Sequence, residues 1–257
     1  MIQQLFDAFA SLPEIEAIAL GGSRAGNHYD EKSDYDIYLY CTAPISEDVR
    51  RGILEKFCSY MEIGNHFWEY EDNCTLKSGI DIDVLYRNLD DFTADVSGVA
   101  EGYNARNGYT TCMWHNLRTC NIICDKTGRL TQAKARFDIP YPPQLKKNII
   151  ERNRKLLHNT MPAYELQITK AVNRGDLVSI NPRVAAFMES YFDILFALNE
   201  QTHPGEKRLS ALCKEYCAIL PEQFEENLTL LFSHMFTQPG LVKEDLHRIL
   251  DALEKIV

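Results

Sequence analysis

The chain has 257 residues, of which 45% are hydrophobic and 25% charged, proportions that are ordinary for a soluble globular protein. Its formal net charge of −10 argues against a broad binding surface for duplex DNA or RNA, which would need a basic face. No apolar run approaches the roughly 18 residues of a membrane span, and no secretory signal begins the chain, so we expect a cytoplasmic protein.

The first predicted elements alternate between helix and strand. Apolar residues at helical spacing predict a helix over residues 1–12, and a short apolar run predicts a strand over 14–20. A second strand ends at Tyr40. Ser46 and an acidic first turn then predict the start of a helix over 46–62, because both features stabilise a helix N-terminus.

Further strands are expected in the next part of the chain. Residues 67–70 and 77–87 are predicted strands joined through a polar bend, and the second has the period-two pattern of a strand with one buried face. After it come the remaining elements before residue 140: helices over 89–99 and 109–118, a short strand over 122–124 and a turn over 125–128.

A proline-rich segment, Pro140-Tyr141-Pro142-Pro143, is the clearest candidate boundary, because proline fixes φ and removes hydrogen-bond donors. After it the strand signals stop and only amphipathic helices are expected, over 144–158, 163–174, 182–199, 206–219, 222–236 and 241–257. Asn181-Pro182 is a predicted helix start. The predicted fold is therefore α+β, with a mixed-sheet domain over 1–140 and a helical bundle over 141–257.

The stretch between the first two strands carries the chemistry. Gly21-Gly22-Ser23 follows the first strand, and ten residues separate Ser23 from Asp34. Asp34 and Asp36 are two apart, so on a strand they share a face roughly 6–7 Å apart and can offer oxygen ligands to Mg²⁺. Glycine lets the backbone approach a phosphate, and Ser23 can open a helix whose N–H groups attract anions.

Each part of this motif also has a simpler interpretation. A Gly-Gly-Ser sequence is usually a turn, and an Asp-x-Asp pair is usually a solvated strand face. Here, however, Asp34-Tyr35-Asp36 leads directly into the apolar residues 37–40. Two like charges at the start of a buried strand are unfavourable unless a cation offsets them. The combination therefore suggests the handling of a metal-bound nucleotide.

These residues resemble the signature of the DNA polymerase beta-like nucleotidyltransferase superfamily: a Gly-Ser pair, a loop of about this length, an Asp-x-Asp and a third carboxylate on a later strand. The later strand is present as Gly79-Ile80-Asp81-Ile82-Asp83-Val84. Arg174-Gly175-Asp176 and the residues 195–199 are similar to the helical half of bacterial small-molecule nucleotidyltransferases, including antibiotic adenylyltransferases. The resemblance spans roughly residues 15–210.

The resemblance implies roles for individual carboxylates. Asp34 and Asp36 would hold one or two Mg²⁺ ions and so take part in catalysis. Asp81 and Asp83 compete for the third carboxylate, which would take the proton of the acceptor or complete a second metal site. Both project from the same strand face, and the resemblance favours Asp83 with Asp81 as the runner-up.

Other residues are candidates for binding the nucleoside triphosphate, expected to be ATP. Gly22 and Ser23 would form the phosphate turn. Arg24 would contact a phosphate or pair with Asp30 or Glu31. Lys207 is a candidate for the β- and γ-phosphates, because related enzymes often use a basic residue of the helical domain there.

The leading functional hypothesis is transfer of a nucleoside monophosphate, expected to be AMP, to a hydroxyl of a small and possibly cationic molecule of the aminoglycoside or lincosamide type. A second hypothesis keeps this chemistry with a protein or tRNA end as the acceptor. A third is a non-catalytic nucleotide-binding module, which would be expected to have lost a carboxylate. The oligomeric state is expected to be monomer or homodimer.

Overall fold

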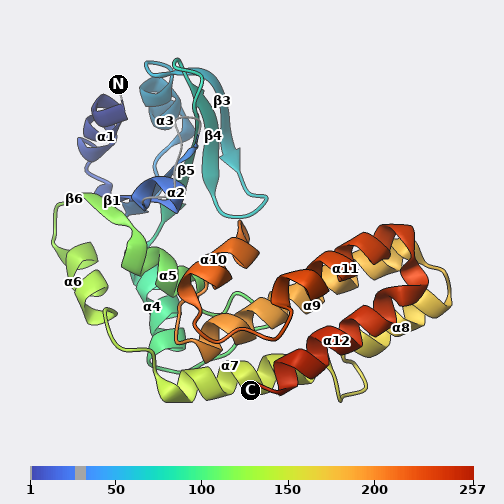
Figure 1. The fold of residues 1–257 in the computed structure, drawn as a ribbon. Coiled ribbons are helices and arrows are strands. Elements are labelled where there is room, and N and C mark those ends of the chain that lie inside the picture. The colour runs from blue at the N-terminus through green and yellow to red at the C-terminus, as the bar shows by residue number, and fades with distance from the viewer. Residues whose placement is uncertain (1, 27–32) are drawn as a thin grey trace. The chain divides into compact units, whose positions relative to one another are not determined.

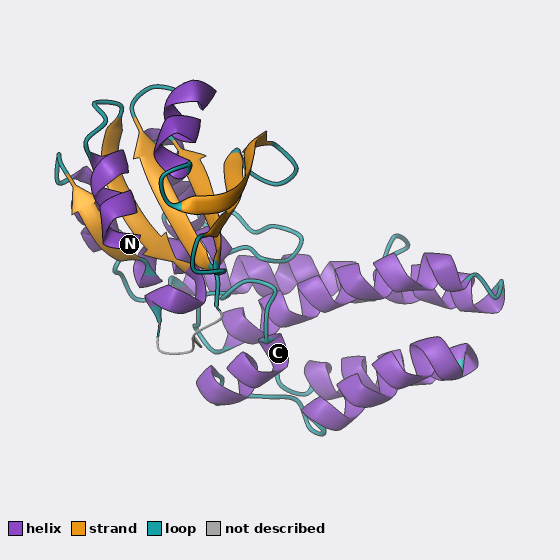
Figure 2. Ribbon diagram, turned by 90° about the horizontal axis from the view of Figure 1, so that it is seen from above, coloured by secondary structure: helices purple, strands orange, loops and turns teal. Residues whose placement is uncertain are grey.

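The chain forms two compact units in the computed structural model, which describes residues 2–26 and 33–257. The first unit comprises residues 1–97 and 116–139, and the second comprises residues 98–115 and 140–257. Two of the three divisions fall inside helices, α4 (Leu89–Ala100) and α5 (Cys112–Thr119), and the third follows residue 139. All strands of the described residues belong to the first unit, whereas the second is built of helices (Figure 2).

A single sheet organises the first unit (Figure 1). Its strands are β1 (Ile15–Gly21), β2 (Tyr35–Cys41), β3 (Cys58–Asn65), β4 (Glu71–Leu76), β5 (Asp81–Arg87) and β6 (Asn121–Asp125). Their order across the sheet is β3-β4-β5-β2-β1-β6. Only the β2–β5 pair is parallel among these neighbours. The mixed sheet and its helices confirm the predicted α+β class.

One face of the sheet packs against α1 (Ile2–Ala10) and α3 (Glu47–Leu54). Alternate residues of each strand point to this face, as the pleat of a strand requires. The core between the sheet and these two helices includes the buried residues Leu5, Phe9, Ile15, Ile18, Ile37, Leu39, Leu54, Ile82 and Val84. Ser46 caps α3 as predicted, accepting a hydrogen bond from the backbone N–H of Val49 at 3.5 Å.

Two predictions in this part of the chain are wrong. The helix expected over 46–62 ends at Leu54, and residues 58–65 form β3. The strand expected over 67–70 is a loop, in which Phe67 and Trp68 are 80% and 89% exposed. The strand that pairs with β3 is instead β4, whose polar sequence suggested a bend.

A buried ion pair explains why β4 is a strand in spite of its acidic residues. Asp72 points to the core face, where its carboxylate lies 2.8 Å from the guanidinium of Arg50, and both side chains are fully buried. The Tyr86 hydroxyl and the Gly64 backbone N–H also donate hydrogen bonds to it, at 2.7 and 2.8 Å. Burial nevertheless raises the pKa of Asp72. The charge is therefore accommodated only because Arg50 and neutral donors surround it.

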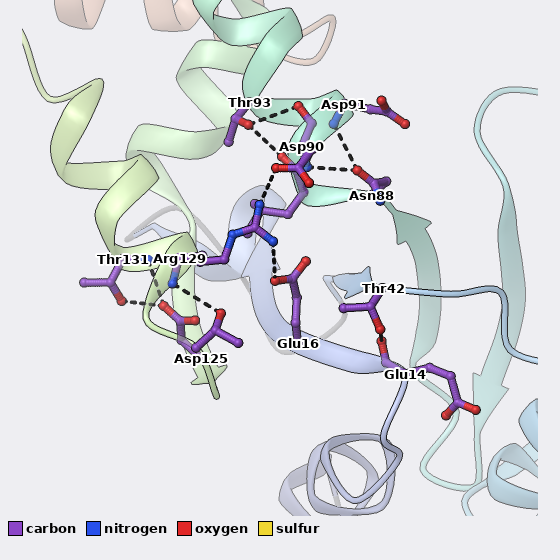
Figure 3. Close-up of polar contacts among 12 residues, drawn as sticks. Glu14, Glu16, Thr42, Asn88, Asp90, Asp91, Thr93, Asp125, Arg129 and Thr131 are labelled. Carbon is purple, nitrogen blue, oxygen red and sulfur yellow. Dashed lines mark hydrogen bonds and ion pairs between the residues drawn. The ribbon is translucent and has the colours of Figure 1, made fainter.

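A further helix, α6 (Arg129–Arg136), was not expected from the sequence and is tied to the sheet by polar contacts (Figure 3). Arg129 donates to the buried Glu16 carboxylate of β1 at 3.0 Å and also pairs with Asp90 of α4. The Asp125 carboxylate accepts hydrogen bonds from the backbone N–H and the hydroxyl of Thr131, both at 2.8 Å. These contacts anchor α6 at the β6 side of the unit.

The second unit is a bundle of helices, coloured yellow-green to red in Figure 1. They are α7 (Pro143–Leu157), α8 (Tyr164–Asn173), α9 (Leu177–Leu198), α10 (Leu209–Tyr216), α11 (Phe224–Thr237), the 3₁₀ turn η1 (Pro239–Leu241) and α12 (Val242–Glu254). In the described part of the chain, no helix combines the length and the apolarity that crossing a membrane needs.

The expected start of α9 at Asn181-Pro182 is wrong. The helix begins at Leu177, and the Asp176 carboxylate caps it by accepting a hydrogen bond from the Ser179 backbone N–H at 3.1 Å. Pro182 lies inside the helix, near its start. A proline there loses one backbone hydrogen bond, which the buried C-terminal half of α9 offsets through packing.

A buried carboxylate in the second unit has a different environment from Asp72. Asp193 of α9 is 1% exposed and accepts hydrogen bonds from the backbone N–H and the hydroxyl of Thr110, at 3.0 and 2.7 Å. It also accepts one from the Asn153 amide of α7 at 2.9 Å. Burial raises the pKa of Asp193 to about 6. Two of these contacts fasten residue 110 to α9 and the third joins α7 to α9, and all three donors are neutral.

Candidate functional site

The glycine turn and the first carboxylate of β2 are in contact. Gly21 ends β1 and pairs in register with Asp36 of β2. Gly22 follows with a φ of +60°, and a Cβ built there would overlap Oδ2 of Asp36. Glycine is therefore required at position 22 both by its left-handed backbone and by the close approach of the carboxylate.

Strand pairing aligns Asp36 with one of the two candidates for the third carboxylate. In the parallel pair β2–β5, Asp36 is the register partner of Asp83, so both side chains lie on the same face of the sheet. Adjacent strands are about 4.8 Å apart. Asp34 immediately precedes β2, two residues from Asp36. Asp81 is exposed, whereas Asp83 is half-buried, so the arrangement favours Asp83 over Asp81.

The same face continues over β4 and β3 as a row of polar side chains. Asn73 of β4 is in register with Asp83 and donates a hydrogen bond to its Oδ1 at 2.8 Å. Glu71, two residues earlier on β4, has a raised pKa, first because it is buried and also because of the charge of Asp83. No motif in the sequence marks Asn73, and the strand that carries it, β4, is not predicted from the sequence.

Arg24 braces the two ends of the loop between β1 and β2. It lies in the short helix α2 (Gly22–Ala25), and its Nε donates to the backbone carbonyls of Ser33 and Asp34, at 2.7 and 3.1 Å. Its guanidinium also lies over the Tyr35 ring, 3.9 Å from the centroid. Its expected alternative partners, Asp30 and Glu31, lie outside the described residues. The structure thus gives Arg24 a bracing role in addition to the proposed phosphate contact.

The predicted role of Ser23 in opening α2 is wrong. Gly21 occupies the N-cap position of this four-residue helix and, as a glycine, offers no side chain to cap it. Ser23 lies inside the helix and is half-buried. The reason is that α2 begins at the left-handed Gly22, two residues before a helix capped by Ser23 would begin.

Tyr38 occupies the position next to Asp36 on the same face. A Cβ on Gly21 would overlap its ring, so the glycine pair accommodates both side chains that follow in β2. The Tyr38 hydroxyl accepts a hydrogen bond from Asn116 at 2.7 Å, and Arg87 lies over the ring at 4.1 Å. Burial raises the pKa of Tyr38 to about 12, with Asp36 adding to the effect and Arg87 opposing it. The hydroxyl therefore stays neutral near pH 7.

The remaining predicted residue, Lys207, belongs to the second unit. It is exposed and lies in the segment just before α10. Its part in binding phosphates stays a proposal.

The chemistry of the carboxylates fits a hard divalent cation. Asp34, Asp36 and Asp83 offer only oxygen donors, which Mg²⁺ prefers. Among the described residues, no three His, Cys, Asp or Glu side chains converge closely enough to hold a metal ion by themselves. Mg²⁺ in nucleotide enzymes is usually bound by one or two carboxylates together with substrate phosphates and water. The aligned Asp36 and Asp83 fit that mode of binding.

Comparisons with known proteins find remote similarities. A family model described as a domain of unknown function (DUF4037) matches residues 110–209. A search of curated proteins finds no significant match. Among solved structures, a nucleotidyltransferase-like protein from Exiguobacterium sibiricum 255-15 is similar with a TM-score of 0.44 and 11% identity, over 100% of this chain and 74% of that chain.

Two named enzymes show weaker similarity. An aminoglycoside 6-adenyltransferase from Bacillus subtilis has a TM-score of 0.27 and 10% identity, over 99% of this chain and 90% of that chain. The CCA-adding enzyme of Thermotoga maritima, complexed with tRNA, has a TM-score of 0.27 and 13% identity, over 97% of this chain and 77% of that chain. Similarities this remote leave the activity to be argued from the residues of the chain itself.

Proposed function

We propose that this protein transfers a nucleoside monophosphate, AMP from ATP in the simplest case, to a hydroxyl group of a small molecule and releases pyrophosphate. The observation that carries the proposal is the register of β2 with β5, which sets Asp36 beside Asp83 on one face. The close approach of Gly22 to Asp36 further supports the proposal, because Gly22 belongs to the turn that we propose for the phosphates.

In this proposal Asp34, Asp36 and Asp83 hold Mg²⁺ together with phosphate oxygens. When bound there, the cation would supply positive charge to the phosphates and to the entering and leaving oxygens. The backbone of Gly22 and Ser23 lies against the phosphates, with Arg24 beside them. Lys207 is the basic residue that we propose for the β- and γ-phosphates. Positioning and charge neutralisation provide most of the catalysis in phosphoryl transfer.

The reaction forms one bond and breaks one bond at the α-phosphorus. The hydroxyl oxygen of the acceptor attacks and forms a new phosphate ester, while the bond to the bridging oxygen breaks and its electron pair leaves with pyrophosphate. The hydroxyl proton passes to the Asp83 carboxylate, which orients the acceptor for the attack. Asp81 is the alternative in this role.

We further propose a cationic acceptor, of the aminoglycoside or lincosamide type. The face that carries Asp83 also carries Glu71 and Glu62 on the neighbouring strands β4 and β3. The whole chain has a formal net charge of −10. An acidic surface raises the local concentration of cationic molecules. We propose a cytoplasmic location, where nucleoside triphosphates are available.

The test is an assay of pyrophosphate release from ATP and Mg²⁺ with a panel of aminoglycosides and lincosamides. We expect at least one acceptor to be modified, and Asp83→Asn to lower the rate about 100-fold or more. Asp81→Asn is the matched control on the same strand and should retain activity. No release with any acceptor, together with no shift in unfolding temperature on adding Mg²⁺ and nucleotides, would disprove the proposal.

A further inference from the structure

We propose that Asn73 is a positioning residue that sets the orientation of the Asp83 carboxylate, an inference that rests on the proposed function. Asn73 Nδ2 donates a hydrogen bond to Asp83 Oδ1 at 2.8 Å, across the paired strands β4 and β5. Rotation about the last side-chain bond of an aspartate is only loosely restrained. A donor held against one oxygen therefore decides where the other oxygen points.

The direction of the Asn73 amide follows from its own neighbours. Asn65 Nδ2 donates to Asn73 Oδ1 at 2.6 Å and to Glu62 Oε2 at 3.3 Å. Glu62 also accepts a hydrogen bond from the Tyr60 hydroxyl at 2.6 Å. An ionised carboxylate can only accept hydrogen bonds. The NH₂ group of Asn65 must therefore face Glu62, and the NH₂ group of Asn73 must face Asp83. The row of hydrogen bonds thus ends with an N–H aimed at Asp83.

The strand order gives this row a functional consequence. Because β5 lies between β4 and β2, Asp83 is flanked by Asn73 on one side and Asp36 on the other. The amide occupies Oδ1 of Asp83, which leaves Oδ2 for the cation or for the acceptor hydroxyl. Partners behind a metal ligand typically affect metal affinity or activity by about 10- to 100-fold. Asn73 should act at this level, through Asp83 and without touching the substrate.

The neighbouring register pair on the same strands provides a matched control. Thr75 Oγ1 donates a hydrogen bond to Asp81 Oδ1 at 2.8 Å, two residues along from the Asn73–Asp83 pair. Asp81 is the alternative third carboxylate and is exposed. Thr75→Val removes the same kind of hydrogen bond from the carboxylate that the proposal does not use, and it keeps the side-chain shape.

The experiment measures binding of Mn²⁺, a paramagnetic substitute for Mg²⁺, by electron paramagnetic resonance of the full chain with α,β-methylene ATP. We expect Asn73→Ala and Asn73→Leu to weaken Mn²⁺ binding about tenfold or more. Asn65→Ala should have a smaller effect, because it only orients Asn73. Thr75→Val should stay within about twofold of the wild type. Thermal unfolding of each variant verifies the fold.

A double-mutant cycle tests whether Asn73 acts through Asp83. In an Asp83→Asn background, Asn73→Ala should weaken Mn²⁺ binding no further, because the carboxylate that it orients has been replaced. With an acceptor in hand, Asn73→Ala should lower kcat and leave KM for that acceptor unchanged. A purely structural role predicts additive losses in the cycle, and that result would overturn the inference.

The wild type separates the two levels of the proposal. If it binds neither Mn²⁺ nor the nucleotide analogue, the proposed function and this inference are both wrong. If the wild type binds both and the folded Asn73 variants bind as tightly, only the inference is wrong. Unfolding of both Asn73 variants would identify a structural residue and would likewise overturn the inference. A large loss in Thr75→Val would do the same, because it would identify Asp81 as the operative carboxylate.

Discussion

The two faces of β4 and β5 hold acidic side chains in opposite ways. On the face toward α1 and α3, the fully buried Asp72 forms an ion pair with the equally buried Arg50. On the opposite face, Asp83 is half-buried, and in the described part of the chain its hydrogen-bond partner is the neutral amide of Asn73. Asp72 and Asn73 are thus neighbours on β4 with opposite surroundings. The charge of Asp72 is neutralised inside the fold, whereas Asn73 contacts the carboxylate of Asp83, which has no such counter-charge among the residues that the structure describes.

The difference separates structural from functional charge. A carboxylate paired with a buried arginine has its counter-charge built into the fold, and removing either partner leaves the other uncompensated. A carboxylate held by amides is oriented, but its negative charge remains available to a cation from outside. This contrast is the physical reason for placing the site on the Asp83 face.

The largest expected effect is on the neutralised face. Asp72→Ala leaves the Arg50 guanidinium buried without its carboxylate, and we expect the free energy of unfolding to fall by about 3–5 kcal/mol. Urea unfolding measures this change. The control is Asp138→Ala, which removes an aspartate from the exposed pair with Arg118. It should cost less than about 1 kcal/mol. Equal losses for the two variants would contradict the comparison.

A buried carboxylate without a cation sharpens the comparison in the second unit. Neutral donors surround Asp193, and burial raises its pKa to about 6 from the ordinary 3.8. Between these values the folded state holds a proton that the unfolded state has lost. The contribution of this carboxyl group to the free energy of unfolding is therefore greatest below about pH 4. It falls as the pH rises toward 6, by up to about 3 kcal/mol.

Unfolding free energies measured from pH 4 to pH 7 test this expectation. The difference between the wild type and Asp193→Asn isolates the contribution of this carboxyl group from all others that titrate in the range. We expect the wild type to lose stability relative to the variant as the pH rises. If the unfolding free energies of the wild type and Asp193→Asn change with pH in parallel, Thr110 and Asn153 compensate the buried charge fully. Neutral donors would then stabilise a buried carboxylate as well as an arginine does.

The sequence predicts those elements in which the apolar residues are buried and the charged residues are exposed. Apolar and acidic residues alternate over 80–84 in the strand expected over 77–87, and β5 lies within that strand. The same reasoning fails for β4, because the buried Asp72 indicates a bend unless its pairing with Arg50, 22 residues earlier, is known. It also misses α6, whose ties to Glu16 and Asp90 come from distant parts of the chain.

The candidate site shows the same limit. Spacing alone places Asp81 and Asp83 on one face of their strand, but it cannot say which of them stands beside Asp36. That choice depends on the register of a parallel pair, which is a property of the whole sheet. Asn73 had no signal at all, because its role exists only once β4 is paired with β5.

The smallest expected effect on stability is that of replacing a glycine of positive φ by alanine. Comparing Gly22 with Gly79 separates the cost of backbone strain from an effect on the proposed site. Gly22 and Gly79 both have positive φ, of +60° and +85°, so an alanine at either position costs about 1–2 kcal/mol. A Cβ at position 22 would also overlap Oδ2 of Asp36, whereas a Cβ at position 79 meets nothing within 4 Å. The two substitutions therefore share the backbone strain and differ only at the carboxylate.

We expect Gly22→Ala and Gly79→Ala to lower the free energy of unfolding by similar amounts, because the Asp36 side chain can rotate away from the new methyl group. Only Gly22→Ala should weaken Mn²⁺ binding in the presence of α,β-methylene ATP, because that rotation takes Asp36 out of line with Asp83. Equal Mn²⁺ binding by the two variants would show that the position of Asp36 does not matter to the cation. The face of the sheet that carries Asp36 and Asp83 would then be an ordinary acidic surface, whose charges are stabilised by solvent alone.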